Sequence, residues 1–401
     1  MRRRLSPRAL TIAASGGILF VAGSTAQAGW LFVLAAGVFG LVVGSLFVRQ
    51  HLSGADVQRT VPGRVRAGDD VRVGIAVTNF SKRRLPLMRV SDSFEAFDPT
   101  AVAVERLGPG ETVTLEQVRR AERRGVYEGG EVSLRAGAPF GFMSTTRTVD
   151  VPTSFVVVPR WVELTSFPIL EPSSFPSDVL HERARTGAGE EYMGVRDYRP
   201  GDPQRSVHWR STARAGRLVV REYEEEVASK VVLIIAGGDE GAPPDSSFES
   251  LVSAAASIAR YALQTGHPID LVRYDADGNI ARVDGPDRFS VLDWLARAVP
   301  NNLPLLPLVA PSLARIGRRG TVVIFSGTTG VAGREIQQTV RSIQTAGSRA
   351  IVVAAKTTSW APSSQAISEE ESVLSELGRG RASVRVISQG EDLFDCLTSL
   401  V

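Results

Sequence analysis

The sequence predicts a membrane-anchored multidomain protein with two N-terminal transmembrane helices, then a β-sandwich-like region, then a doubly wound α/β domain. Three observations support this fold class. Residues 9–48 contain no charged side chain, short strand patterns fill residues 57–160, and apolar strands alternate with helical patterns after residue 227. The expected segments are a transmembrane hairpin (1–50), the β-rich region (57–160), a linker (161–188), a charged segment (189–226) and the α/β domain (227–401).

The charge-free stretch is long enough for two membrane-spanning helices. It covers residues 9–48, and one span needs about 20 apolar residues. Its middle is polar, with the run Ser24-Thr25-Ala26-Gln27-Ala28-Gly29. We therefore expect helices over Leu10–Ala26 and Trp30–Val48, with the Trp30 ring at the membrane interface.

The distribution of charge predicts the orientation of this hairpin. The chain has a net charge of +3 and a pI near 9.2, but residues 1–60 contain six arginines and one acid, Asp56. The rest of the chain is slightly acidic, which argues against binding to nucleic acid. Arginines flank both spans, and the loop between the spans has none. The positive-inside rule therefore places both ends, and the large region after residue 50, in the cytoplasm of a multi-pass cell-membrane protein.

A cleavable signal peptide is the alternative interpretation of the N-terminus. A basic start precedes an apolar stretch, and Ala26-Gln27-Ala28 has the A-x-A cleavage pattern. The hairpin is favoured because a second long apolar segment follows at once. Both interpretations place the large region in the cytoplasm.

Residues 57–160 show the alternation that half-buried strands produce. Val71, Val73, Ile75 and Val77 alternate with small or polar residues. Further strands are expected at Ala101–Arg106, Thr112–Gln117, Glu131–Arg135 and Phe155–Val158. Short strands with Gly and Pro between them are typical of an antiparallel sandwich.

Two patches in this region have two possible roles. They are Arg123-Arg124-Gly125-Val126-Tyr127 and Ala138-Pro139-Phe140-Gly141-Phe142. Either they form a contact surface of arginines and aromatic rings, or they are tight turns whose aromatic side chains fill the core. The second role is favoured, because Gly and Pro have ordinary backbone reasons to occupy turns.

The segment 189–226 is the most distinctive part of the chain. Arg199-Pro200-Gly201 indicates a turn, and Asp202 followed by Pro203 is typical of a helix N-cap and first helical position. We expect a short helix through Val207, Trp209 and Ala213, followed by a strand over Leu218–Glu226 at the edge of the next domain.

Four roles remain open for this segment. Its arginines could bind a phosphate or an acidic partner, His208 could serve acid–base chemistry, or the segment could dock another protein. It could also be a structural clasp between domains, held by ion pairs. An enzyme or phosphate site would lie around Arg196, Asp202, His208 and Arg210.

At this segment the chain resembles a known family. The pattern G-x-E-Y/F-x-G-x-R-x-Y-x-P-G-D-x-x-R-x-x-H-W-x-x-x-A-R, followed by L-V-V-R-E-x-E, is similar to the signature of the bacterial domain of unknown function fifty-eight. The signature positions, which form the candidate interaction site, are Glu191, Tyr192, Arg196, Tyr198, Pro200, Gly201, Asp202, Arg205, His208, Trp209, Arg214, Arg221 and Glu222.

The resemblance implies an architecture and a class of partner, but no reaction. It implies a membrane hairpin, a β-rich region and a von Willebrand factor A-like C-terminal domain. The β-rich region would carry an R-R-G-x-Y motif and a D-P-F-G-L-F-like turn, in which Ala138 here replaces the acid. The family is commonly encoded beside MoxR-type AAA+ ATPases and transglutaminase-like membrane proteins.

The C-terminal region alternates strands with helices. The continuous apolar run Lys230–Ala236 is typical of a strand buried on both faces. Strands are expected also at Ile269–Tyr274, Ile280–Val283, Thr321–Phe325, Ala350–Ala355 and Ser383–Ile387, and helices at Ser247–Thr265, Phe289–Ala298, Arg334–Ala346, Glu369–Leu377 and Glu391–Leu400. This order predicts a mainly parallel, doubly wound sheet.

No cofactor or metal site is expected. Von Willebrand A-like domains usually carry a D-x-S-x-S metal motif after the first strand, where this chain has Ala236-Gly237-Gly238-Asp239-Glu240. The leading acid and both serines are missing, so Asp239 and Glu240 are at most a degenerate site. The single cysteine, Cys396, and the unpaired histidines exclude the common zinc patterns.

These observations lead to one functional expectation. We expect a membrane-anchored adaptor that faces the cytoplasm and works with a MoxR-type AAA+ ATPase on membrane or envelope complexes. The chain lacks a P-loop and a nucleophile elbow, so no enzyme activity is expected.

Overall fold

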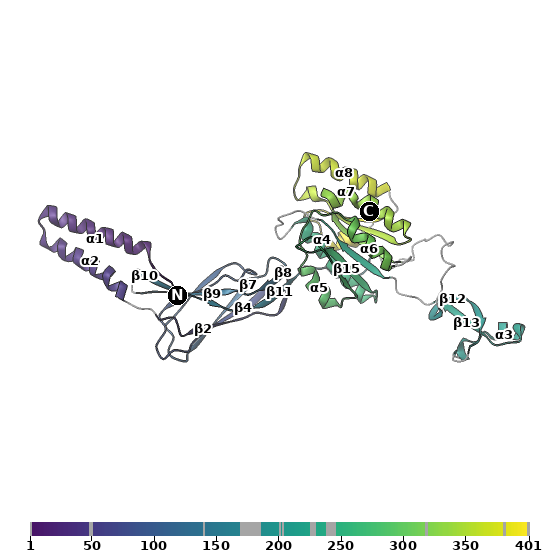
Figure 1. Cartoon of the computed structure of the whole chain (residues 1–401), viewed down its shortest axis with the longest axis horizontal. Coiled ribbons are helices and arrows are strands. Elements are labelled where there is room, and N and C mark those ends of the chain that lie inside the picture. Colours follow the sequence, from purple (N-terminus) through teal and green to yellow (C-terminus); the bar gives the residue numbers. More distant parts are fainter. Residues whose placement is uncertain are drawn as a thin grey trace. The chain divides into compact units, whose positions relative to one another are not determined.

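The computed structural model describes residues 2–47, 51–138, 141–168, 186–199, 202, 204–224, 230–237, 246–316, 320–379 and 382–398 (Figure 1). The chain forms two compact units. One comprises Met1–Arg160 with Leu292–Arg297, and the other comprises Trp161–Val291 and Ala298–Val401.

The first unit begins with a helical hairpin of α1 (Pro7–Ala26) and α2 (Gly29–Phe47). Ser6 caps α1 by accepting the Ala9 N–H, and Gln27 ends the helix in the left-handed conformation. Small residues allow the helices to pack closely, since a Cβ at Gly16 would lie 3.0 Å from Val38. Both helices begin and end within a few residues of the predicted bounds.

One helix of this hairpin meets the requirements of a membrane span. Among the described residues, α1 is long and apolar enough to cross a bilayer, whereas the apolar part of α2, Gly29–Ser45, is shorter. The structure thus supports one candidate span, where the sequence predicted two.

The rest of the unit is β-rich. A five-stranded sheet has the order β1-β10-β9-β5-β6, and two three-stranded sheets have the orders β2-β4-β7 and β3-β11-β8. The strands are β1 (Arg2–Leu5), β2 (Ala55–Thr60), β3 (Arg64–Arg66), β4 (Asp70–Asn79), β5 (Met88–Asp92), β6 (Thr100–Val104), β7 (Thr112–Arg120), β8 (Gly125–Glu128), β9 (Glu131–Ala138), β10 (Met143–Asp150) and β11 (Ser154–Val158).

The sheets pack face to face over a core that the alternation predicted. Val71, Val73, Ile75 and Val77 on β4 are all buried, while their neighbours are less so. One core cluster combines β2 and β4 with β5, β6 and β9, as a sandwich requires. All five predicted strands exist, as β4, β6, β7, β9 and β11, and β1, β2, β3, β5, β8 and β10 were not predicted.

The two aromatic patches lie in this region. Tyr127 is half-buried, packs edge-on near Phe94, and donates its hydroxyl to the Arg123 carbonyl. Phe142 is buried, and Pro139 and Phe140 lie outside the described residues. The described aromatic rings therefore fill the core, as the turn interpretation predicts.

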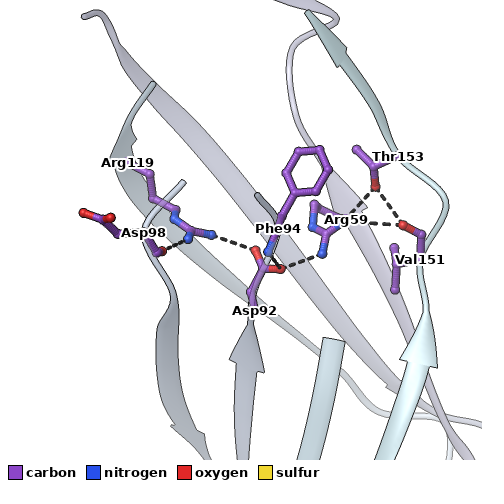
Figure 2. A network of polar contacts seen from close by, with 7 residues as sticks. All are labelled: Arg59, Asp92, Phe94, Asp98, Arg119, Val151 and Thr153. Atoms are coloured by element: carbon purple, nitrogen blue, oxygen red, sulfur yellow. Dashed lines mark hydrogen bonds and ion pairs between the residues drawn. The ribbon is translucent and has the colours of Figure 1, made fainter. Parts of the chain in front are cut away.

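A buried carboxylate joins three strands of the sandwich (Figure 2). Asp92 on β5 is held by Arg59 of β2 at 2.5 Å and by Arg119 of β7 at 2.7 Å, and all three side chains are almost fully buried. Arg59 also donates to the Thr153 hydroxyl, and the two guanidinium groups lie over Phe94 and Phe97. Burial lowers the pKa of Arg119, and the charge of Asp92 opposes that shift.

The second unit contains a six-stranded sheet with the order β16-β15-β14-β17-β18-β19. Its strands are β14 (Val231–Ile235), β15 (Ile269–Tyr274), β16 (Ile280–Asp284), β17 (Thr321–Gly327), β18 (Arg349–Ala355) and β19 (Ser383–Ile387). Only β16 is antiparallel, paired with β15 across the turn at Gly278. Counted from the first strand of this sheet, the order is 3-2-1-4-5-6, which is that of a doubly wound sheet.

Helices cover the faces of this sheet. They are α4 (Ser247–Gln264), α5 (Arg288–Ala296), α6 (Leu306–Ile316), α7 (Gly330–Thr345), α8 (Ser364–Arg379) and α9 (Leu393–Thr398), with a 3-10 turn η3 (Thr357–Ser359). All predicted helices and strands of this region exist. Helix α6 was missed, because Pro307 and Pro311 interrupt its periodic pattern.

The start of the predicted linker is ordered on α4. The Val162 N–H donates to the Ser257 hydroxyl, Trp161 lies under the Arg260 guanidinium at 4.7 Å, and Glu163 pairs with Arg260 at 2.7 Å. The Arg260 hydrogen bond lowers the pKa of Glu163. Residues 169–185 of the linker lie outside the described residues.

Candidate functional site

The charged segment forms a small hairpin module, which we define as residues 186–224. Its strands β12 (Thr186–Asp197) and β13 (Val219–Glu224) pair antiparallel, with irregular register near Tyr192. Among the described residues they form a sheet of their own, so the expectation that the second strand edges the next domain was wrong. Val219 and Val220 are buried in the module.

The predicted single helix between these strands is broken in two. A 3-10 turn, η2 (Gln204–Ser206), is followed by a separate helix, α3 (Trp209–Ala215). Between them Val207 is buried and bridges to Val220, and the His208 N–H donates to the Val219 carbonyl. The burial of Val207 against the strand overrides helix continuity. His208, not Asp202, is the residue that precedes the helix.

Asp202 closes the loop between β12 and η2. Its carboxylate accepts two hydrogen bonds from the Arg196 guanidinium, at 2.7 and 2.9 Å, and one from the Arg199 N–H at 2.8 Å. Charge-assisted, bidentate pairs of this kind fix geometry strongly. The Arg196 hydrogen bonds, with help from Arg199, lower the pKa of Asp202 to about 2.

His208 faces the first turn of α3. Its Nδ1 lies 2.7 Å from the Ser211 hydroxyl, and its carbonyl accepts the N–H groups of Ser211 and Thr212. Thr212 in turn accepts the Val219 N–H at 3.1 Å, which ties α3 to β13. The described contacts of His208 are therefore those of a residue that joins a helix to a strand.

The outer surface of the module combines apolar and basic side chains. Trp209 is 68% exposed, Leu218 45% and Val195 42%. Arg210, Arg214 and Arg217 are also exposed, and Arg217 pairs with Asp197 at 2.9 Å. A largely exposed tryptophan beside arginines is a composition typical of interface hot spots.

The remaining predicted residues divide into two groups. The backbone places Glu191 and Tyr192 on β12, Arg205 in η2, and Arg221 and Glu222 on β13, while the Tyr198 N–H donates to the Leu218 carbonyl. Pro200, Gly201, Asp239 and Glu240 lie outside the described residues. The structure thus brings Arg196 and Asp202 together, and it pairs His208 with neither of them.

A second polar cluster, which the sequence did not predict, lies at the carboxyl ends of β17 and β18. Glu370 of α8 is 2% exposed and accepts hydrogen bonds from the Thr328 hydroxyl at 2.5 Å, the Thr358 N–H at 3.2 Å, and the Thr358 hydroxyl. Thr357 contacts Thr328. The sequence signal that could have revealed this cluster is the threonines that follow β17 and β18, because the carboxyl ends of parallel strands meet at one edge of the sheet. Among the described residues, no group of three or more His, Cys, Asp or Glu side chains is arranged to hold a metal ion.

Part of the chain, including most of this module, matches a known protein family. Residues 194–359, which include most of the hairpin module and much of the six-stranded sheet, match the family model described as a protein of unknown function, DUF58. The chain carries a DUF58 domain. It is also 24% identical over 270 residues to the uncharacterized protein YeaD of Bacillus subtilis. That match covers 64% of this chain and 63% of YeaD, so it spans less than two thirds of the relative.

Two solved structures resemble about a quarter of the chain each. The CARDB domain of PF1109 from Pyrococcus furiosus is 16% identical and covers 25% of this chain and 93% of its own, with a TM-score of 0.17. The FixG-related protein from Vibrio parahaemolyticus is 13% identical and covers 26% of this chain and 98% of its own, also with a TM-score of 0.17. Scores this low carry no argument about fold or activity.

Proposed function

We propose that this DUF58-domain protein is a membrane-anchored adaptor that faces the cytoplasm and docks another protein through its hairpin module. The partner that the family resemblance favours is a MoxR-type AAA+ ATPase working on membrane or envelope complexes. We assign the six-stranded sheet and its helices to a von Willebrand factor A-like domain, and the strand order 3-2-1-4-5-6 supports that assignment.

The connectivity of the N-terminal hairpin supports the membrane anchor. The chain enters α1 directly from β1 and, after α2, continues into β2 of the same unit. Both ends of the hairpin therefore belong on one side of the bilayer, together with the sandwich. The flanking arginines support the cytoplasm as that side.

The same connectivity supports retention of the N-terminus. Residues Arg2–Leu5 pair along their whole length with Met143–Thr146 of β10. Cleavage after Ala28 would remove β1 and leave β10 as an unprotected edge strand. A signal peptide is removed from the mature protein, so it is not expected to supply a strand of that protein's sheet.

One observation carries the docking proposal, namely the 68% exposure of Trp209 on a short helix that is hydrogen-bonded to β13. An exposed indole with Arg210 and Arg214 on the same helix suits a partner with an apolar pocket and an acidic rim. Arg196 and Asp202 shape the loop that precedes this helix and contribute no free charge.

The alternative is an enzyme or phosphate site around Arg196, Asp202, His208 and Arg210. Two contacts count against it. Both terminal nitrogens of Arg196 are directed at Asp202, and His208 Nδ1 contacts Ser211. Binding of a phosphate by Arg196 would have to break its pair with Asp202.

Co-purification tests the proposal. The full chain is extracted from its native membrane in mild detergent, as wild type and as Trp209→Ser, with Ile280→Ser as the matched control on an exposed apolar residue of β16. We expect the ATPase to accompany the wild type and the control but not the Trp209 variant. Wild-type protein that recovers no ATPase would refute the proposed partner.

A further inference from the structure

Both ends of the helical hairpin contact the same end of the sandwich. At the start of α1, the Ser6 N–H donates to the Phe142 carbonyl at 2.9 Å, beside the turn between β9 and β10. After α2, Arg147 of β10 donates to the carbonyls of Leu52, Ser53 and Ala55 at 2.6 to 2.8 Å. A single strand, β10, thus holds the chain where it enters the hairpin and where it leaves it.

The loop between β4 and β5, residues 80–87, lies at this same end. The Phe80 N–H donates to the Gly54 carbonyl at 2.8 Å, and Arg83 Nη1 lies 2.9 Å from His51 Nε2. His51 is four residues after the last residue of α2. The loop is therefore fixed next to the point where the chain leaves the helical hairpin.

Side chains at this end are basic and exposed. Lys82, Arg83 and Arg84 form an exposed run in the loop, and Phe80 is 73% exposed. We define the basic rim as the exposed residues Arg4, Arg8, Lys82, Arg83, Arg84 and Arg106. Among the described residues of segments 4–8, 51–54, 80–87, 105–111 and 141–142, the acids are Glu105 and Glu111.

At the opposite end of the sandwich, one loop is acidic. The loop between β5 and β6, residues 93–99, contains Glu95 and Asp98 and no basic residue. That loop thus lacks the basic run that the loop between β4 and β5 carries beside the helical hairpin.

We propose that the basic rim binds the headgroups of anionic phospholipids, with Phe80 inserted at the level of the headgroups. The hydrogen bonds that join both ends of the hairpin to the sandwich keep the rim near the bilayer surface, and each basic residue there gains about fivefold in association with an anionic leaflet. Aromatic side chains are favoured at this depth. The inference rests on the proposed membrane anchor and adds to it a lipid preference that the anchor alone does not require.

Reconstitution of the full chain tests this. Wild-type protein is inserted into nanodiscs that contain equal amounts of phosphatidylglycerol and phosphatidylcholine, and the lipids retained after gentle detergent release are counted by native mass spectrometry. We expect wild type to retain phosphatidylglycerol in excess. In the variant Lys82→Gln/Arg83→Gln/Arg84→Gln, the ratio of retained phosphatidylglycerol to phosphatidylcholine should fall at least about fivefold.

A matched control removes the same charge elsewhere on the sandwich. Arg72, Arg120 and Arg123 are exposed, and Arg72→Gln/Arg120→Gln/Arg123→Gln should retain the wild-type preference. Equal loss in both triple variants, or equal retention of the two lipids by wild type, would overturn the lipid proposal. Extraction of the wild type from vesicles at alkaline pH would instead refute the membrane anchor, so the two failures are distinguishable.

Discussion

Arg196 and Asp202 form a bidentate ion pair, with nitrogen–oxygen distances of 2.7 and 2.9 Å, that closes the loop between β12 and η2. The two residues are six positions apart, and the Arg199 N–H adds a third hydrogen bond to the same carboxylate. The pair sets the path of the chain into the helix that presents Trp209.

The first prediction concerns the pKa of Asp202. It is lowered to about 2 from an ordinary value of 3.8, so the pair's stabilisation of the loop is complete above pH 3.8 and is lost as the pH falls towards 2. Arg196→Gln should raise this pKa while leaving it below 3.8, because the Arg199 N–H remains. NMR titration of the Asp202 carboxyl carbon measures the pKa in the wild type and in the variant. Arg217→Gln, which removes the separate pair with Asp197, should leave the pKa of Asp202 unchanged.

The second prediction concerns the buried carboxylate of the sandwich. Asp92→Ala leaves Arg59 and Arg119 buried without their shared counter-charge, which should cost about 3–5 kcal/mol of stability. Asp69→Ala removes only the exposed pair with Arg66 and should cost at most about 1 kcal/mol. Hydrogen exchange of amides in β2, β5 and β7 measures the difference. Similar costs for the two variants would contradict the argument.

The third prediction compares two adjacent glutamates on α8. Glu370→Ala leaves the buried Thr358 hydroxyl and the Thr358 N–H without their acceptor, at about 1–3 kcal/mol for each unsatisfied group, while the Thr328 hydroxyl keeps the Ala355 carbonyl as an acceptor. Glu369→Ala breaks only an exposed pair with Arg334, worth at most about 1 kcal/mol. Hydrogen exchange at the ends of β17 and β18 should therefore rise sharply in the first variant alone.

These contacts also show where sequence reasoning succeeds and fails. Buried strands such as β14 are predictable because every residue from Val231 to Ile235 is apolar and both faces are covered. Glu370 was not predictable, because it stands in a run of three glutamates and only packing decides which of them turns inward.

Pairs distant in sequence were missed for a related reason. Arg59 and Asp92 are 33 residues apart, and no local pattern joins them. The Arg2–Leu5 strand was missed because its arginines were interpreted only as the basic flank of a membrane span. Asp202 was predicted to cap a helix, but the sequence could not show that it would pair with Arg196 and that His208 would precede α3.

The fourth prediction concerns the N-terminus. Because β1 pairs along its whole length with β10, the mature protein should retain residues 2–28. Mass spectrometry of the protein isolated from its native membrane should recover a peptide that contains Arg4 and Leu5. A mature chain that begins at Gly29 would show that a signal peptidase removes the strand.

The hairpin module is proposed to dock a partner at Trp209 while the protein is anchored in the membrane. Replacement of Trp209 by a photo-crosslinking phenylalanine analogue, followed by irradiation of intact native membranes, tests this claim most directly. We expect a crosslink to an AAA+ ATPase from position 209 and none from the matched exposed position Ile280. An ATPase crosslink from Ile280 alone, or no protein crosslink from position 209, would contradict it.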